Sequence, residues 1–164
     1  MKNSEGMSKI VKTAASTIFV FTLIYGLYVI AHGHLTPGGG FQGGAVVASG
    51  LVMLIVVFGS SWTMKKIKEE NLSILESFGA IGFIGLGFLG LLFTGIFFKN
   101  FIVGHNMFFG MIPDFGSTIA NINTGGVLPL MNFAVGLKVI AGLFAIVLVM
   151  AHATSSYSKE AGKK

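Results

Sequence analysis

Long apolar runs, separated by short polar or glycine-rich stretches, dominate the hydrophobic pattern of the chain. They predict helices over residues 10–32, 41–62, 72–98 and 131–153. With a rise of about 1.5 Å per residue, a helix of about 20 apolar residues crosses a hydrocarbon core of about 30 Å. The pattern therefore predicts an all-α integral membrane protein with four transmembrane helices.

The stretch over residues 99–130 interrupts this pattern. It is rich in phenylalanine, but several glycines, Pro113 and Pro129 divide it, so no apolar run in it is long enough to span. We expect a structured outer loop that folds back on the helices or is covered by partners, with a re-entrant piece as an alternative. Residues 1–164 would then form a single membrane domain, built as one compact bundle.

The composition supports a chain surrounded by lipid. Charged residues make up 10% of the sequence, 53% is hydrophobic and the mean hydropathy is +0.82, whereas soluble domains carry about 25% charged residues. The absence of cysteine excludes disulfides, iron–sulfur clusters and thiolate catalysis. The net charge is +5, and lysine is the only residue that contributes to the Lys+Arg count. The positions of these lysines argue for a role in membrane topology rather than for a nucleic-acid partner.

The lysines predict the orientation of the four helices. Nine of the eleven fall in the N-terminal segment, the loop after residue 62 and the C-terminal tail. With four spans these three regions lie on one side, and the positive-inside rule makes that side cytoplasmic, with both termini there. A fifth span within residues 99–130 would place the C-terminal lysines outside. We therefore expect a multi-pass protein of the cytoplasmic membrane.

A glycine-rich stretch over residues 32–44, which we call the hinge, joins the first two predicted helices. Pro37 disfavours a helical conformation of the preceding residue, so the first helix must end before it. Small residues recur at Gly40, Gly44 and Ala48, a spacing that lets another helix backbone approach closely. The stretch lacks the Lys-Ser/Thr ending of a phosphate-binding loop. It is typical of a tight turn with close packing, and its backbone groups and His34 would line a polar path at the membrane edge.

Two of the ionisable residues within the predicted spans, Lys138 and Glu76, are candidates for a functional role. Lys138 lies near the middle of the last one, where a lysine costs at least about 2.5 kcal/mol and is typical of an ion path. The alternatives are that Lys138 extends to the interface or bonds a partner's carboxylate. Glu76 lies closer to the cytoplasmic edge, so solvation at the helix start is as good an interpretation as a relay role.

The histidines do not predict a metal or haem site. His32 and His152 end different predicted helices on opposite membrane faces, about 30 Å apart. His34 and His105 share the outer side, but only Asp114 is near in sequence to complete a zinc site. We expect no metal and no other cofactor.

The hinge resembles the signature GH-x-x-PGGGF-x-GG of the MnhB family, the MnhB/MrpB-like subunits of Mrp-type Na+/H+ antiporters. The resemblance extends over nearly the whole chain, with four spans, a glycine-rich third helix and a Phe-x-x-Gly pattern at Phe133 to Gly136. The residues that match the signature are Gly33, His34, Pro37, Gly38, Gly39, Gly40, Phe41, Gly43 and Gly44.

One position departs from the antiporter pattern. The MnhB subunits of antiporters often carry an acidic residue within the last motif, where this chain has Ala134, followed by Lys138. The run LPLMNFAVGLKV looks more like the version in archaeal membrane-bound hydrogenases and related sulfur-reducing complexes.

The resemblance implies an accessory, non-catalytic membrane subunit without a redox cofactor. Its partners would be the other membrane subunits of an Mrp-type module and a hydrogenase-like peripheral module, which drives the expulsion of sodium ions. Candidates for an ion pathway are Lys138, Glu76 and His34. The alternatives are the MnhB subunit of a stand-alone Mrp antiporter, a purely structural scaffold subunit and an independent small transporter.

Overall fold

The computed structural model describes residues 7–35, 37–103, 110 and 125–161, and these residues form helices joined by short connections. Within them, four helices are long and apolar enough to cross a membrane, which is consistent with the four predicted spans. The helices are α1 (Lys9–Ala31), α2 (Gly39–Phe58), α3 (Ser60–Lys66), α4 (Glu69–Thr94) and α5 (Leu128–Ala161).

The helix predicted over residues 41–62 is two helices in the structure. Gly59 breaks it with φ +91° and ψ 150°, a conformation that is essentially restricted to glycine. The chain then forms α3, so the lysine-rich stretch predicted as a loop is largely helical. Only Ile67 and Lys68 separate α3 from α4.

The third helix ends earlier than predicted, at Thr94 rather than at residue 98. Gly95 adopts the left-handed conformation with φ +74°, and its N–H donates to the Leu91 carbonyl at 2.8 Å, which is a common way for a helix to end. The chain then turns back along α4, where the Phe98 N–H donates to the Gly87 carbonyl at 3.3 Å.

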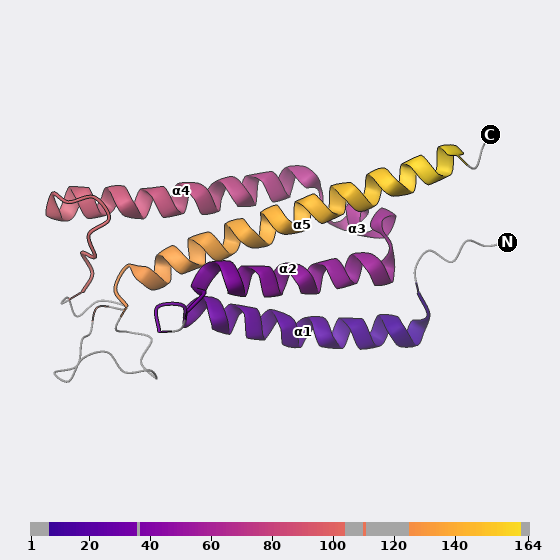
Figure 1. Ribbon diagram of the computed structural model, residues 1–164, viewed down its shortest axis with the longest axis horizontal. Helices are drawn as coiled ribbons and strands as arrows, with labels where there is room; N and C mark the ends of the chain where they lie inside the picture. Colours follow the sequence, from indigo (N-terminus) through magenta and orange to yellow (C-terminus); the bar gives the residue numbers. More distant parts are fainter. Residues whose placement is uncertain (1–6, 36, 104–109, 111–124, 162–164) are drawn as a thin grey trace.

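The last helix is longer than predicted. α5 begins three residues before residue 131, with Pro129 in its first turn, where its missing N–H costs nothing. It continues beyond residue 153 to Ala161, so most of the polar stretch that we expected to be a tail is helical. Figure 1 shows its C-terminal part extending past the other helices.

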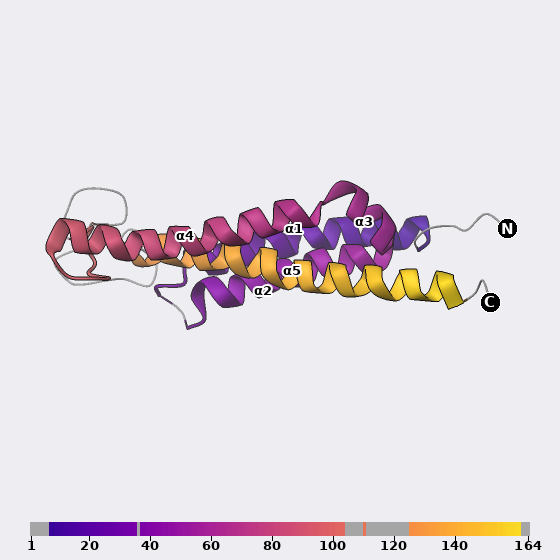
Figure 2. The ribbon, with the colours of Figure 1, turned by 90° about the horizontal axis from the view of Figure 1, so that it is seen from above.

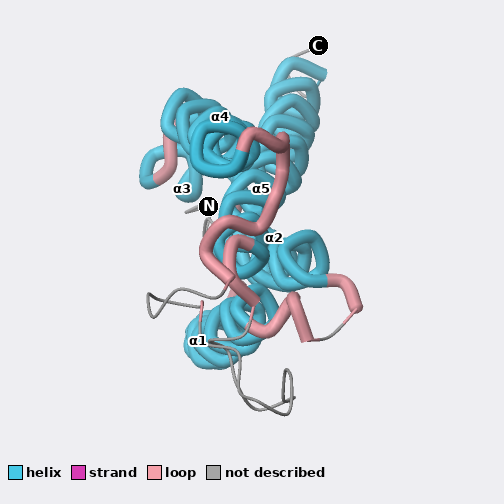
Figure 3. The backbone as a smooth tube through the Cα atoms, turned by 90° about the vertical axis from the view of Figure 1, so that its left-hand side faces the viewer, coloured by secondary structure: helices cyan, strands magenta, loops and turns pink. Residues whose placement is uncertain are grey.

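The long helices form an open, curved row rather than the compact bundle that we expected. α1 packs on α2, α2 on α5 and α5 on α4 (Figure 1). Seen from above, α1 and α4 lie along roughly the same line, and α2 and α5 are both displaced to the same side of that line (Figure 2). Viewed along the helices, the row is curved and α3 lies on its concave side (Figure 3). α1 and α4 therefore form the two ends of the row.

Glycines stand at every seam of this row. In the α1–α2 seam, a Cβ placed on Gly26 would lie 2.9 Å from the Gly43 carbonyl oxygen. In the α2–α5 seam, a Cβ on Gly44 would lie 2.9 Å from the Gly136 carbonyl oxygen. These distances are too short for a real Cβ, so the backbones touch only because the side chains are absent. Such contacts hold helices together in lipid, where hydrophobicity cannot.

The predicted small-residue ladder at Gly40, Gly44 and Ala48 accordingly packs within the chain, on the buried side of α2. In the α4–α5 seam the same role falls to Gly79, whose Cβ would lie 2.7 Å from the Ala134 carbonyl oxygen.

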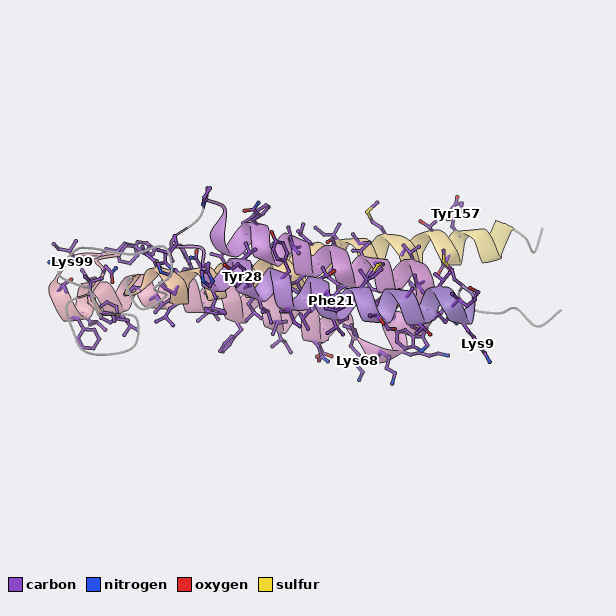
Figure 4. All side chains as sticks on the ribbon, turned by 90° about the horizontal axis from the view of Figure 1, so that it is seen from below. Lys9, Phe21, Tyr28, Lys68, Lys99 and Tyr157 are labelled. Carbon is purple, nitrogen blue, oxygen red and sulfur yellow. The ribbon has the colours of Figure 1, made fainter. Side chains whose placement is uncertain are left out.

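The two ends of the molecule along the helix axes differ in charge. Both chain termini leave at one end (Figure 1). Lys9, Lys68 and Tyr157 lie toward that end, whereas Lys99 lies at the other (Figure 4). The lysine asymmetry of the sequence is therefore an asymmetry between the two ends of the molecule.

Candidate functional site

The hinge lies at the end of the molecule opposite the termini. α1 ends at His32, whose N–H donates to the Tyr28 carbonyl at 3.0 Å. α2 begins after Gly38, which has φ +107°, and Gly39 follows with φ +41°. Both values favour glycine, because L-residues with a side chain rarely adopt them. Thr36 lies outside the described residues.

Asn132, in the second turn of α5, is the residue around which the hinge is built. A Cβ on Gly33 would lie 2.6 Å from Asn132 Nδ2, and one on Gly39 would lie 2.8 Å from Oδ1. A Cβ on Gly40 would meet the backbone carbonyl of Asn132. Three glycines of the signature therefore leave space for one residue of another helix. The sequence analysis missed Asn132, although an amide in an apolar helix start was a signal.

The His34 side chain is half-buried in the hinge, and its ring makes no hydrogen bond with the described residues. Both ring nitrogens are inaccessible, and neither has a partner among the described residues. The ring packs beside the start of α5, since a Cβ on Gly125 would lie 2.8 Å from His34 Cγ. An unsatisfied buried polar atom costs about 1–3 kcal/mol, so this imidazole needs a functional reason or a polar partner from outside the described residues.

Asn100 is a second polar residue that the sequence analysis missed. Its Nδ2 donates to the Gly125 carbonyl at 3.0 Å, and its Oδ1 accepts from the Val127 N–H at 2.9 Å. One side chain thus joins the segment after α4 to the segment before α5. The end opposite the termini therefore gathers His34, Asn100 and Asn132 from three separate stretches of the chain.

Lys138 and Glu76 flank the α4–α5 seam. A Cβ on Gly79 would lie 3.0 Å from Lys138 Cβ, and one on Gly142 would lie 3.6 Å from Glu76 Cδ. The Lys138 side chain is exposed and that of Glu76 is half-buried. Neither takes part in a hydrogen bond or an ion pair among the described residues. The two opposite charges lie within about one helical turn of each other along the seam.

The contact with Gly79 places Lys138 well away from both ends of α4. Gly79 is about 15 Å along α4 from Glu69 and about 22 Å from Thr94, with about 1.5 Å per residue. Lys138 is in turn about 13 Å along α5 from Pro129, which lies beside His34. His34 and the Lys138–Glu76 pair are therefore two separate places, and the structure does not join the three candidates into one site.

No group of three or more histidine, cysteine, aspartate or glutamate residues that could hold a metal ion occurs in the part of the chain that the structure describes. His105 and Asp114, which we considered for zinc, lie outside that part. The loop expected over residues 99–130 is likewise described only at 99–103, 110 and 125–130.

Four long apolar helices that pack at glycine seams are typical of a multi-span membrane protein. Residues 10–145 match the family model described as "Domain related to MnhB subunit of Na+/H+ antiporter". The chain therefore belongs to the family of MnhB-related domains, as the hinge signature predicted.

Individual relatives refine this assignment. An uncharacterized protein of Methanocaldococcus jannaschii is 35% identical over 141 residues, which cover 82% of this chain and 48% of the relative. A Na(+)/H(+) antiporter subunit of Bacillus subtilis is 35% identical over 49 residues, covering 30% of this chain and 34% of that protein. The chain thus spans about half the length of the archaeal relative.

A solved structure matches most of the fold. One chain of the membrane-bound sulfane sulfur reductase (MBS), an archaeal respiratory membrane complex, superposes with a TM-score of 0.70 at 30% identity. The match covers 92% of this chain and 60% of the MBS chain. The structural neighbour is therefore a subunit of a respiratory membrane complex.

Proposed function

We propose that the chain is an accessory, non-catalytic subunit of an Mrp-type Na+/H+ antiport module within a redox-driven respiratory complex. The observation that supports this most is the match of one MBS chain to 92% of this chain, at 30% identity and a TM-score of 0.70. The replacement of an acidic residue by Ala134, with Lys138 one turn later, favours the same choice.

The proposal includes an orientation. The end of the molecule that carries both termini, Lys9 and Lys68 (Figure 4) would face the cytoplasm, since short cytoplasmic loops are enriched in lysine. The hinge and Lys99 would then face outward.

Within the module, Lys138 and Glu76 would carry charge on the ion route. Three points support this role: the position of both residues within the apolar helices, their proximity across the α4–α5 seam, and the cost of keeping ionisable groups in a membrane without a function. His34 would contribute at the outer end, where its unsatisfied ring nitrogens can bind water or a proton. None of these residues would act as a catalytic group, and the module's large proton-pumping subunits would be separate chains.

The test is Lys138→Ala in the assembled complex, with sodium-dependent proton movement measured in inverted vesicles. We expect transport to fall by about tenfold or more while the complex stays assembled. A tenfold loss corresponds to about 1.4 kcal/mol in the transport barrier. Lys99→Ala is the matched control, since Lys99 is exposed at the outer end and should transport normally.

A purely structural scaffold predicts a different outcome. In that case Lys138→Ala and Glu76→Gln would either leave transport unchanged or lower it only in proportion to lost assembly on native gels. An independent small transporter would instead give sodium flux from the purified chain alone in liposomes. We expect no flux from it.

A further inference from the structure

One side of the α4–α5 seam opens into an apolar groove. Its volume is about 480 Å³, and its walls come from the outer part of both helices. Three large lining side chains, Phe78, Leu89 and Phe133, are exposed by 69%, 39% and 42%. Two of the lining residues on α4 are Gly82 and Gly85.

These two glycines differ from the other glycines of α4 because little in the described chain fills the space beside them. The space beside Gly79 is filled by α5, and that beside Gly87 and Gly90 by the returning residues 98 and 99. A Cβ on Gly85 would meet no described atom within 4 Å, and one on Gly82 would meet only Ala134 Cβ, at 3.6 Å. Each glycine costs a helix about 1 kcal/mol relative to alanine. Close packing among the described residues does not account for that cost.

Lys138 does not line this groove itself but lies beside Gly79, at one end of it. Gly79 lines the groove, and its Cβ position is 3.0 Å from Lys138 Cβ. The Lys138 side chain is exposed, has no partner among the described residues, and lies about midway through a span of about 30 Å. An exposed charge at that depth requires an opposite charge from outside the chain or from a neighbouring side chain that turns toward it.

We propose that this groove is the docking site for a transmembrane helix of a neighbouring subunit. That helix presents small residues to Gly82 and Gly85 and an aspartate or glutamate to Lys138. A lipid acyl chain fits the observations less well, because a flexible chain needs no glycines and offers no carboxylate at mid-membrane depth. The inference requires that the chain is part of a membrane complex, but it does not depend on ion transport through Lys138.

The absence of cysteine from the sequence makes a site-specific cross-link straightforward. Gly85→Cys and Leu89→Cys would each carry benzophenone maleimide in the purified complex, and mass spectrometry would locate the photo-cross-link. Both should reach the same apolar segment of a neighbouring subunit. That segment should carry an acidic residue about six positions from the Gly85 cross-link and about ten from the Leu89 cross-link, since these residues are about 9 Å and about 15 Å from Gly79 along α4.

Ile84→Cys is the matched control, because Ile84 neighbours Gly85, is 52% exposed and does not line the groove. It should not cross-link to that segment. Cross-links from both groove positions to lipid alone, or to a segment without an acidic residue, would overturn the proposal.

A charge exchange tests the pairing itself. Lys138→Glu together with replacement of the acidic residue by lysine should restore an association that Lys138→Glu alone abolishes. Failure of this rescue, with both proteins still in the membrane, would contradict the pairing. Transport, measured separately, tests the ion-route role.

Discussion

Two polar residues shape the end of this protein that lies opposite the termini. Asn132 fills the space that the hinge glycines leave, and Asn100 bridges Gly125 and Val127. The glycine signature of the hinge is therefore matched to a residue almost a hundred positions away.

Replacing Asn100 should loosen the start of α5. Asn100→Ala leaves the Val127 N–H without its partner, which costs about 1–3 kcal/mol for a buried group that remains unsatisfied. The Gly125 carbonyl loses one donor but still accepts from the Leu128 N–H at 3.2 Å. The Val127 amide should exchange with deuterium about tenfold faster or more. Hydrogen exchange of the complex, followed by mass spectrometry of the peptide covering residues 125–130, measures this effect.

Asn71→Ala provides the control for that measurement, because Asn71 is exposed in the first turn of α4. It should leave the exchange of this peptide unchanged. Equal exchange in the Asn100 variant and the wild type would contradict the bridging role.

The sequence could supply only part of this site. The hinge signature predicted Gly33, Gly39 and Gly40 as structural residues, and the match to the family model confirms the family that the signature predicted. It could not identify Asn132 or Asn100 as partners, because no periodic pattern relates residues on separate helices. The roles of Lys138, Glu76 and His34 in an ion pathway stay predictions.

At the scale of the helices, glycine placement sets both the helix ends and the contacts. Gly59 and Gly95 end α2 and α4 in conformations with positive φ. Apolar periodicity does not detect such breaks, since the apolar run continues through them, so the predicted ends at residues 62 and 98 were wrong. In the seams, Gly26, Gly44 and Gly79 let neighbouring backbones touch.

Filling a seam should separate its two helices. In Gly44→Ala the new Cβ would lie 2.9 Å from the Gly136 carbonyl oxygen and from Val139 Cβ. Because a backbone atom cannot move aside cheaply, we expect a destabilisation of about 1–3 kcal/mol. It should appear as a lower temperature at which this subunit leaves the purified complex, measured by native gels after heating.

Gly142→Ala is the matched comparison, since it also adds one methyl group to a helix, but the nearest heavy atom to its Cβ would be Glu76 Cδ, at 3.6 Å in a flexible side chain. It should be better tolerated than Gly44→Ala. If both variants lost the subunit at the same temperature, the close approach of α2 and α5 would not be what stabilises the row.

At the scale of the whole molecule, the open row leaves much apolar surface to be covered by lipid or by other subunits. The number of long helices followed from the length of the apolar runs. Their order, with α5 between α2 and α4, did not, because helices that are apolar on all sides do not reveal which face meets which neighbour. The expected compact bundle was wrong for the same reason.

The proposed orientation makes a prediction about access from the two sides of the membrane. Tyr157 is 79% exposed toward the end with the termini, and Lys99 is exposed at the opposite end. In intact cells, Lys99→Cys should react with a membrane-impermeant maleimide, whereas Tyr157→Cys should react only after permeabilisation. The reverse pattern would place the termini outside, against the lysine distribution.

The central claim is that this MnhB-related chain belongs to an antiport module coupled to a redox complex. The most direct measurement is the subunit composition of the complex that purifies from mild detergent with an affinity tag on this chain. We predict the other membrane subunits of an Mrp-type module together with peripheral subunits that carry metal and sulfur cofactors, in constant ratio. A stable complex that contains antiporter subunits alone, or a chain that purifies without partners, would contradict the claim.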